Sequence, residues 1–142
     1  MQSTADIFVE DSEYCIMDKE KITEIYNKAW GQEHWIINKD YCGKRLVINR
    51  GFRSSLHYHK EKEETLYCLS GRVLMEVADK TFLLNPGEKV NIPPGIRHRF
   101  SGLEQSEIFE FASHHKQEDN YRDSHSEKIP DSEFTKICEA YG

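Results

Sequence analysis

The stretch GFRSSLHYHKEKEETLYCLSG, residues 51–71, decides the fold prediction for this chain of 142 residues. It places His57 and His59 two positions apart, Glu64 five positions later, and a glycine at each end. Side chains two apart in a β-strand point to the same face of the sheet, so both imidazoles can project into one cavity. A turn through residues 60–63, followed by a second strand, would bring Glu64 back opposite them.

A second stretch, GEKVNIPPGIRHRFSG at residues 87–102, supplies a third imidazole. Its Pro-Pro-Gly run predicts a tight turn directly before a strand that begins at His98. Imidazoles and a carboxylate on adjoining antiparallel strands are ligands that a divalent transition metal accepts. We therefore predict a metal site formed by His57, His59, Glu64 and His98.

The sequence around these two stretches predicts an all-β domain. Residues 33–113 consist of short runs rich in Ile, Val, Leu, Phe and Tyr, broken by Gly, Pro and Asn. Eight or nine closely spaced strands of this kind are typical of a sandwich or barrel. Residues 1–32 form a predicted N-terminal arm and helix, because apolar residues recur at helical spacing between Asp18 and Lys28.

The region after the barrel, residues 114–142, has two parts. Residues 114–128 are charged and rich in histidine, which predicts a surface excursion or a flexible arm. His114 and His115 are adjacent and would face opposite ways in a strand, so they predict solvated histidines rather than a second metal site. Pro130 then opens a predicted C-terminal helix whose apolar stripe packs on the barrel or on a partner subunit.

Composition excludes several classes of function. Lys and Arg total 19 against 25 Asp and Glu, and a net charge of −6 disfavours nonspecific binding to nucleic acid or anionic lipid. No uncharged stretch approaches the roughly 20 residues of a membrane span, and the first residues lack the pattern of a secretory signal. The four cysteines form no C-x-x-C pair and are expected to be free thiols. We expect a cytoplasmic protein.

The two stretches together resemble the cupin family. Its first motif, G-x5-H-x-H-x4-E-x6-G, and its second, G-x5-P-x-G-x2-H-x3-N, are matched except that Gly102 replaces the final Asn. The resemblance implies a double-stranded β-helix, or jelly-roll barrel, whose cavity holds one divalent metal ion: Zn, Mn, Fe or Ni. It also implies a homodimer, often with exchanged N-terminal strands. Trp30 and Trp35, outside both motifs, are expected to contribute to that interface.

A narrower resemblance covers residues 29–123, which are similar to the cupin module of type II phosphomannose isomerases. The HYHKEKEE segment also resembles D-lyxose isomerase. These isomerases typically have three residues between the second His and the Glu, which leaves Glu63 as the alternative ligand to Glu64. The resemblance implies a sugar or sugar-phosphate isomerase or epimerase that interconverts aldose and ketose through a metal-stabilised enediolate. The alternatives are an Fe(II) cupin dioxygenase and a non-catalytic cupin that binds metal or sugar.

Four further residues are candidates for the site. Arg53 shares the strand parity of the histidines, so it can face the cavity and bind an anionic group of the substrate; the alternative is a surface arginine. Lys60 and Lys62 can contact substrate at the mouth, or lie in a solvated turn. Glu110 becomes a candidate catalytic base if its strand carries a bulge; otherwise the neighbouring phenylalanines are core residues and Glu110 points outward.

Overall fold

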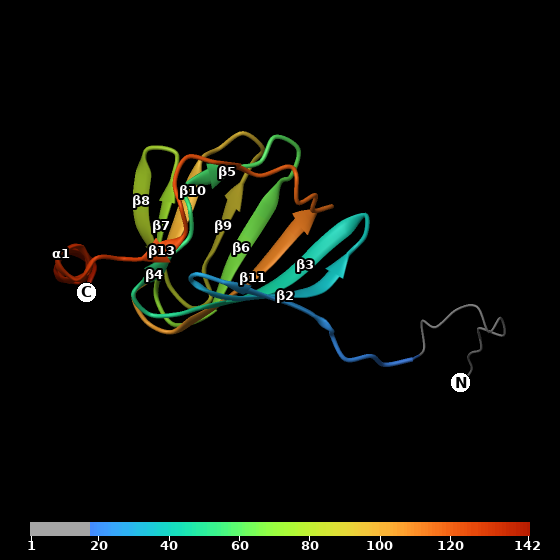
Figure 1. Cartoon of the computed structure of the whole chain (residues 1–142), viewed down its shortest axis with the longest axis horizontal. Helices are drawn as coiled ribbons and strands as arrows, with labels where there is room; N and C mark the ends of the chain where they lie inside the picture. Colours follow the sequence, from blue (N-terminus) through green and yellow to red (C-terminus); the bar gives the residue numbers. More distant parts are fainter. Residues whose placement is uncertain (1–17) are drawn as a thin grey trace.

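The structure, a computed structural model, describes residues 18–142. Two antiparallel sheets face each other and enclose a barrel (Figure 1). In the first sheet the strand order is β1 (Glu24–Lys28), β2 (Gly31–Asn38), β3 (Tyr41–Ile48), β11 (Ser106–Ser113), β6 (Glu64–Ser70) and β9 (Lys89–Ile92). In the second it is β12 (Tyr121–Arg122), β5 (His57–Tyr58), β10 (His98–Gly102), β4 (Phe52–Arg53) and β13 (Glu127–Lys128), with β7 (Val73–Val77) joining β10 to β8 (Lys80–Leu84). The all-β prediction is confirmed.

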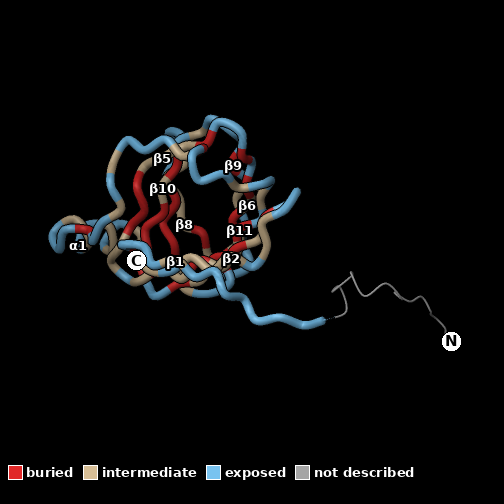
Figure 2. Tube along the Cα trace, turned by 45° about the vertical axis from the view of Figure 1, so that its right-hand side comes forward, coloured by how far each residue is buried: buried red, intermediate tan, exposed pale blue. Residues whose placement is uncertain are grey.

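The inner faces of the two sheets form the core. Alternate residues of β3 and β6 are buried, and the buried parts of the chain line the inside of the barrel (Figure 2). Ile48, Leu66, Met75 and Ile108 are among the fully buried apolar side chains that meet there. Leu46, Leu66 and Phe100 of this core also line the cavity described below.

The N-terminal helix prediction is wrong. The chain from Glu24 to Lys28 is strand β1, which pairs with β2 in a hairpin that closes at Gly31. Gly31 has a φ of 148°, and a Cβ there would lie 1.9 Å from a backbone oxygen of β3, so only glycine fits. Residues 1–17 of the predicted arm lie outside the described residues.

The two tryptophans of this hairpin pack within one chain. Trp30 is buried and contacts Phe100 edge to face, with ring centroids 5.0 Å apart. Trp35 faces the barrel interior, with Tyr26 beside it at 5.0 Å. A single chain therefore buries Trp30 and half-buries Trp35, so neither is left fully exposed, and the interface stays a prediction.

Residues 114–128, named here the closing segment, cross the open end of the barrel and carry β12 and β13. Arg122 pairs with His57 of β5, and Glu127 pairs with Arg53 of β4. The buried carboxylate of Asp119 accepts hydrogen bonds from the backbone N–H groups of residues 60, 61 and 62 at 2.8, 3.0 and 3.1 Å. Most of this segment is exposed, as a surface excursion would be, but its strand pairs and the Asp119 hydrogen bonds tie it to the barrel rather than leaving it as a free arm.

The C-terminal helix is confirmed as α1 (Asp131–Tyr141), which projects from the side of the second sheet (Figure 1). Glu133 accepts a hydrogen bond from Arg53 at 2.6 Å, and the guanidinium of Arg50 lies 5.0 Å from the ring centroid of Phe134. None of its residues is fully buried. Across residues 18–142, no helix has the length and apolar character needed to cross a bilayer.

Candidate metal centre

Three histidines meet in a cavity inside the barrel. His57 on β5 and His98 on β10 are direct cross-strand partners, and His59 follows β5. Their candidate ligand nitrogens all lie within 4.8 Å of one another. The turn before β10 holds the loops together, because the N–H of Gly95 donates to the carbonyl of His59 at 2.6 Å. Gly95 has a φ of 84°, which favours glycine.

Backbone carbonyls fix the orientation of all three imidazoles. Each Nδ1 lies within hydrogen-bond distance of a carbonyl oxygen, and because a carbonyl can only accept, each Nδ1 must carry the hydrogen. This leaves the Nε2 lone pairs free, which is the arrangement found in metal-binding histidines. The three bonds join His57 to Ser55 at 2.7 Å, His59 to Asp119 at 2.7 Å, and His98 to Ile96 at 2.9 Å.

Glu64 enters the same cluster from β6. Its Oε2 lies 3.2 Å from Nε2 of His59 and 3.1 Å from Nε2 of His98, yet this buried oxygen has no hydrogen-bond donor. An unsatisfied buried carboxylate oxygen facing imidazole lone pairs fits a cation, so the residues present suit a divalent metal with three nitrogen donors and one oxygen donor. Glu63 is exposed, and the structure brings Glu64, not Glu63, to the imidazoles.

The electrostatics also favour a positive charge between these residues. Burial raises the pKa of Glu64, but Lys62 and the two imidazoles outweigh burial and hold that pKa well below its ordinary value. Burial lowers the pKa of His98, but its contact with Glu64 outweighs burial and raises it. Burial and the neighbouring His98 lower the pKa of His57 to about 3. A proton and a metal ion therefore compete for the same position.

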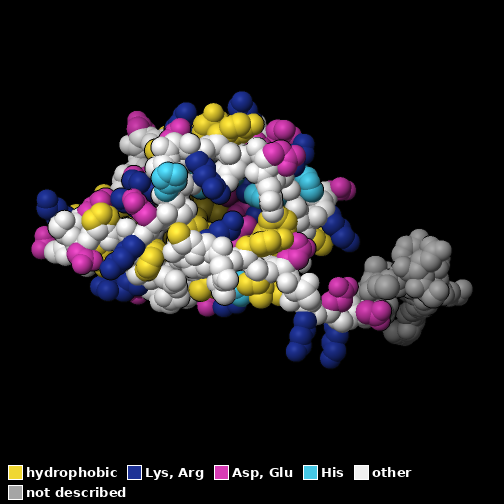
Figure 3. All heavy atoms as spheres, in the orientation of Figure 1, with side chains coloured by type: hydrophobic (Ala, Val, Ile, Leu, Met, Phe, Trp, Pro, Cys, Tyr) yellow, Lys and Arg dark blue, Asp and Glu magenta, His cyan; other side chains and the backbone are white. Residues whose placement is uncertain are grey.

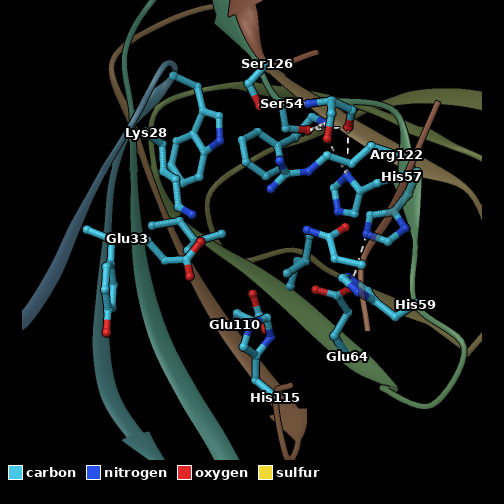
Figure 4. A pocket seen from close by; sticks show the side chains of 18 of the residues that line it. Lys28, Glu33, Ser54, His57, His59, Glu64, Glu110, His115, Arg122 and Ser126 are labelled. Atoms are coloured by element: carbon cyan, nitrogen blue, oxygen red, sulfur yellow. Dashed lines mark hydrogen bonds and ion pairs between the residues drawn. The ribbon is translucent and has the colours of Figure 1, made fainter. Parts of the chain in front are cut away.

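The cluster opens into a cavity of about 360 Å³. Its mouth is a hollow in which basic, acidic and apolar side chains meet (Figure 3). The side chains that line it come from both sheets and from the closing segment (Figure 4). The cavity is therefore large enough for a small organic substrate beside the histidines.

Glu110 lies in this cavity. On β11 the buried positions are Ser106, Ile108 and Glu110, so simple alternation directs Glu110 inward. A register shift between β11 and β6 does occur, between residues 107 and 108. The expectation that Phe109 and Phe111 are core residues is wrong: both lie on the outer face of the sheet, and Phe111 is 56% exposed.

Lys62 is buried directly behind the cavity. Its Nζ donates to Oε2 of Glu110 at 2.9 Å and lies 4.0 Å from Oε1 of Glu64. Burial lowers its pKa, but the two carboxylates outweigh burial and raise it. The solvated-turn interpretation is wrong for Lys62, because the turn folds back under Asp119 of the closing segment.

The structure does not bring Arg53 or Lys60 to the cavity. The Arg53 side chain is buried between Glu127 and Glu133, whose carboxylates accept its hydrogen bonds at 2.9 and 2.6 Å. The Lys60 ammonium lies 4.5 Å from the ring centroid of Tyr121 on the exterior. Both positions correct the expectation of substrate contact, since each cation already has a partner elsewhere.

Several cavity residues were not predicted. Trp35 donates to Oε1 of Glu33 at 2.6 Å, and the buried Lys44 contacts the same oxygen at 3.0 Å. Burial raises the pKa of Glu33, but Lys44 outweighs burial and lowers it. His115 and Arg122 of the closing segment also line the cavity. The available signal was strand parity, since Glu33 and Trp35 lie on the same face of β2 and are flanked by the exposed Gln32 and Ile36.

Comparison with known proteins agrees with this geometry. Residues 45–113 match the model of the Cupin domain family. With the two-sheet barrel around them, this match identifies residues 45–113 as a cupin domain.

Curated relatives match parts of the chain. Polyketide synthase CurC of Streptomyces cyaneus is 34% identical over 61 residues, covering 43% of this chain and 40% of CurC. A mannose-1-phosphate guanylyltransferase of Sinorhizobium fredii is 28% identical over 83 residues, covering 56% of this chain and 16% of that protein. Quercetin 2,3-dioxygenase of Bacillus subtilis is 32% identical over 75 residues, covering 49% of this chain and 22% of the dioxygenase. The chain thus spans less than half the length of each of these relatives.

Solved structures share the fold over more of the chain. KdgF from Halomonas sp. superimposes with a TM-score of 0.58 at 20% identity, covering 61% of this chain and 82% of that one. The nucleoside dehydratase Pac13 gives a TM-score of 0.66 at 16% identity, covering 81% and 97%. At these identities the likeness extends to the fold and not to the reaction.

Proposed function

We propose that this cupin is a metal-dependent isomerase or epimerase of sugars or sugar phosphates, one that moves a proton between C1 and C2 of an aldose–ketose pair. One observation carries the proposal: three imidazoles with free Nε2 atoms and Glu64 converge in the cavity that also contains the carboxylate of Glu110. The similarity to mannose-1-phosphate guanylyltransferase supports a sugar substrate. When bound by His57, His59, Glu64 and His98, a divalent metal supplies a Lewis acid that polarises a carbonyl oxygen.

Glu110 is the base in this proposal. Lys62 holds its Oε2, and within residues 18–142 no hydrogen bond engages its other oxygen. That oxygen can take a proton from a substrate carbon and return it to the neighbouring carbon. The Lys62 ammonium keeps the carboxylate in place and compensates its charge in a buried environment.

His115 orients the substrate as a neutral hydrogen-bond donor. Its Nδ1 lies 3.1 Å from the Lys62 Nζ, and because an ammonium group cannot accept, Nδ1 is the acceptor and Nε2 carries the hydrogen. Burial, followed by the charges of Lys44 and Lys62, lowers the pKa of His115 to about 3. A neutral imidazole therefore donates from the cavity wall to a hydroxyl or carbonyl oxygen.

Solvent exchange tests the proposal. The metal-loaded chain is incubated in D₂O with a panel of aldoses and their phosphates, and proton NMR follows the hydrogen at C2. A shared proton on Glu110 exchanges with solvent, so we expect deuterium at C2 before net conversion is large, and loss of this exchange in Glu110→Gln. Lys116→Met, a change in an exposed ion pair, is the control. Absence of exchange with every sugar contradicts the proposal.

A second candidate is an Fe(II)-dependent dioxygenase. The similarity to quercetin 2,3-dioxygenase favours it, and three histidines with one carboxylate suit oxygen activation. Oxygen uptake by the iron-loaded chain with a flavonol, together with no sugar exchange in D₂O, is the result that supports this reaction over isomerisation.

A further inference from the structure

Two cations point into the cavity without a carboxylate partner. Lys28 of β1 and Arg122 of β12 both line it, and Figure 4 shows their side chains directed inward from its two sides. Across residues 18–142, neither forms an ion pair. Arg53 and Lys60, which sequence parity and position had favoured, face elsewhere, so Lys28 and Arg122 are the cations that substrate can reach.

The position of Arg122 follows from strand pairing. Arg122 is directly opposite His57 in the β12–β5 pair, and His57 is directly opposite His98 in the β5–β10 pair. Directly opposite residues of antiparallel strands project to the same face of the sheet. The Arg122 side chain therefore projects from the same face of the second sheet as His57 and His98, toward the cavity.

The carboxylates of the cavity do not neutralise these cations. Glu33 is paired with Lys44 at 3.0 Å, and Glu110 is paired with Lys62 at 2.9 Å. Glu64 faces the imidazoles and the metal position. Lys28 and Arg122 lie at the solvent-exposed rim of the cavity, and no carboxylate of residues 18–142 forms an ion pair with either cation, so both are available to an anionic ligand.

We infer that Lys28 and Arg122 form an anion subsite, so that the substrate carries a carboxylate or phosphate group beside the oxygens that face the metal. Arginine binds both groups through two parallel N–H donors. Hydroxyls of Ser54, Ser55 and Ser126 line the same cavity and provide donors and acceptors for the uncharged part of such a ligand. This inference rests on the proposed function only for the choice of a sugar as substrate. Anion binding at Lys28 and Arg122 does not require that the chain catalyse isomerisation.

The test measures binding to the full chain, with and without Zn²⁺, at pH 8 and constant ionic strength. The probes are sodium phosphate and sodium acetate, then D-mannose, D-mannose 6-phosphate and D-mannuronate, read by fluorescence of Trp30 and Trp35 and by calorimetry. We expect saturable binding of the simple anions and at least tenfold tighter binding of one anionic sugar than of mannose. The sugar that gains affinity distinguishes phosphate from carboxylate.

Variants assign the subsite. Arg122→Gln and Lys28→Gln should each weaken anion binding about tenfold while leaving mannose binding and the circular dichroism spectrum unchanged. Arg97→Gln is the matched control, because this exposed arginine pairs with Asp123 outside the cavity. No saturable anion binding, or equal affinity in wild type and both variants, overturns the inference. Tight anion binding without deuterium exchange leaves the subsite standing and refutes the isomerase alone.

Discussion

Replacement of Lys62 by methionine tests whether the charge network behind the cavity holds the barrel together. Methionine nearly preserves the volume of the side chain but removes its charge, leaving the buried carboxylate of Glu110 without its partner at 2.9 Å. Removing one member of a buried ion pair costs about 3–5 kcal/mol. We therefore expect Lys62→Met to lower the free energy of unfolding of the metal-free chain by about that amount.

The measurement is urea unfolding followed by tryptophan fluorescence. With a slope of about 1–3 kcal/mol per M, a loss of this size lowers the midpoint by roughly 1–5 M. The result does not depend on pH near neutrality. The pKa of Lys62 is higher in the folded chain than in the unfolded chain, so the ion pair contributes its full stabilisation below the unfolded pKa of about 10.4 and loses it only at higher pH.

Two further variants isolate the cause. Adding Glu110→Gln to Lys62→Met removes the stranded charge and should recover at least half of the loss. Lys116→Met breaks an exposed pair with Glu61 at the same 2.9 Å and should change the stability by less than about 1 kcal/mol. A Lys62→Met chain as stable as the Lys116→Met control, or a double variant less stable than the single one, would refute the reasoning.

The remaining predictions concern the metal, pH and assembly. His59→Ala should lower metal occupancy sharply, measured by mass spectrometry after dialysis, and Glu64→Gln should lower it less because an oxygen remains; unchanged occupancy in both contradicts the metal site. Because the pKa of His115 is lowered to about 3, the unfolded chain binds the extra proton below about pH 6.5, so stability falls with acidification; His115→Gln should reduce the difference between pH 7 and pH 5 by at most about 2 kcal/mol, measured by urea unfolding. We also predict a homodimer in sedimentation experiments, with Phe111→Glu, on the apolar outer face of the first sheet, favouring a monomer; a wild-type monomer at micromolar concentration argues against it.

The candidate ligands and the barrel could be predicted because local rules govern them. The two-residue spacing of His57 and His59 follows directly from strand geometry, and the glycine turns follow from backbone conformation. The β1 hairpin could not be predicted, because Ile22, Ile25 and Tyr26 happen to match a helical period. The strand conformation of Ile25 and Tyr26 depends on pairing with β2, which is a tertiary effect.

The charged residues of the cavity were missed for a different reason. The usual expectation that charges face solvent fails when a barrel has a polar interior in which each carboxylate finds a lysine. Glu110 and Lys62 satisfy each other inside, and Glu33 and Lys44 do the same on the neighbouring strands of the first sheet. Lys62 and Glu110 are 48 positions apart in the sequence, so no local pattern indicates that pair.

Asp119 links access to the cavity with the geometry of the histidine cluster. Its carbonyl fixes the ring of His59, while its carboxylate ties the closing segment to residues 60–62. Any fluctuation that lifts this segment from the mouth also releases His59 to rotate. A metal ion that binds His59 only in its fixed orientation therefore stabilises the docked position of the closing segment. By linkage, docking of the segment strengthens metal binding by the same free energy. Loss of the bound ion is consequently coupled to motion of the closing segment.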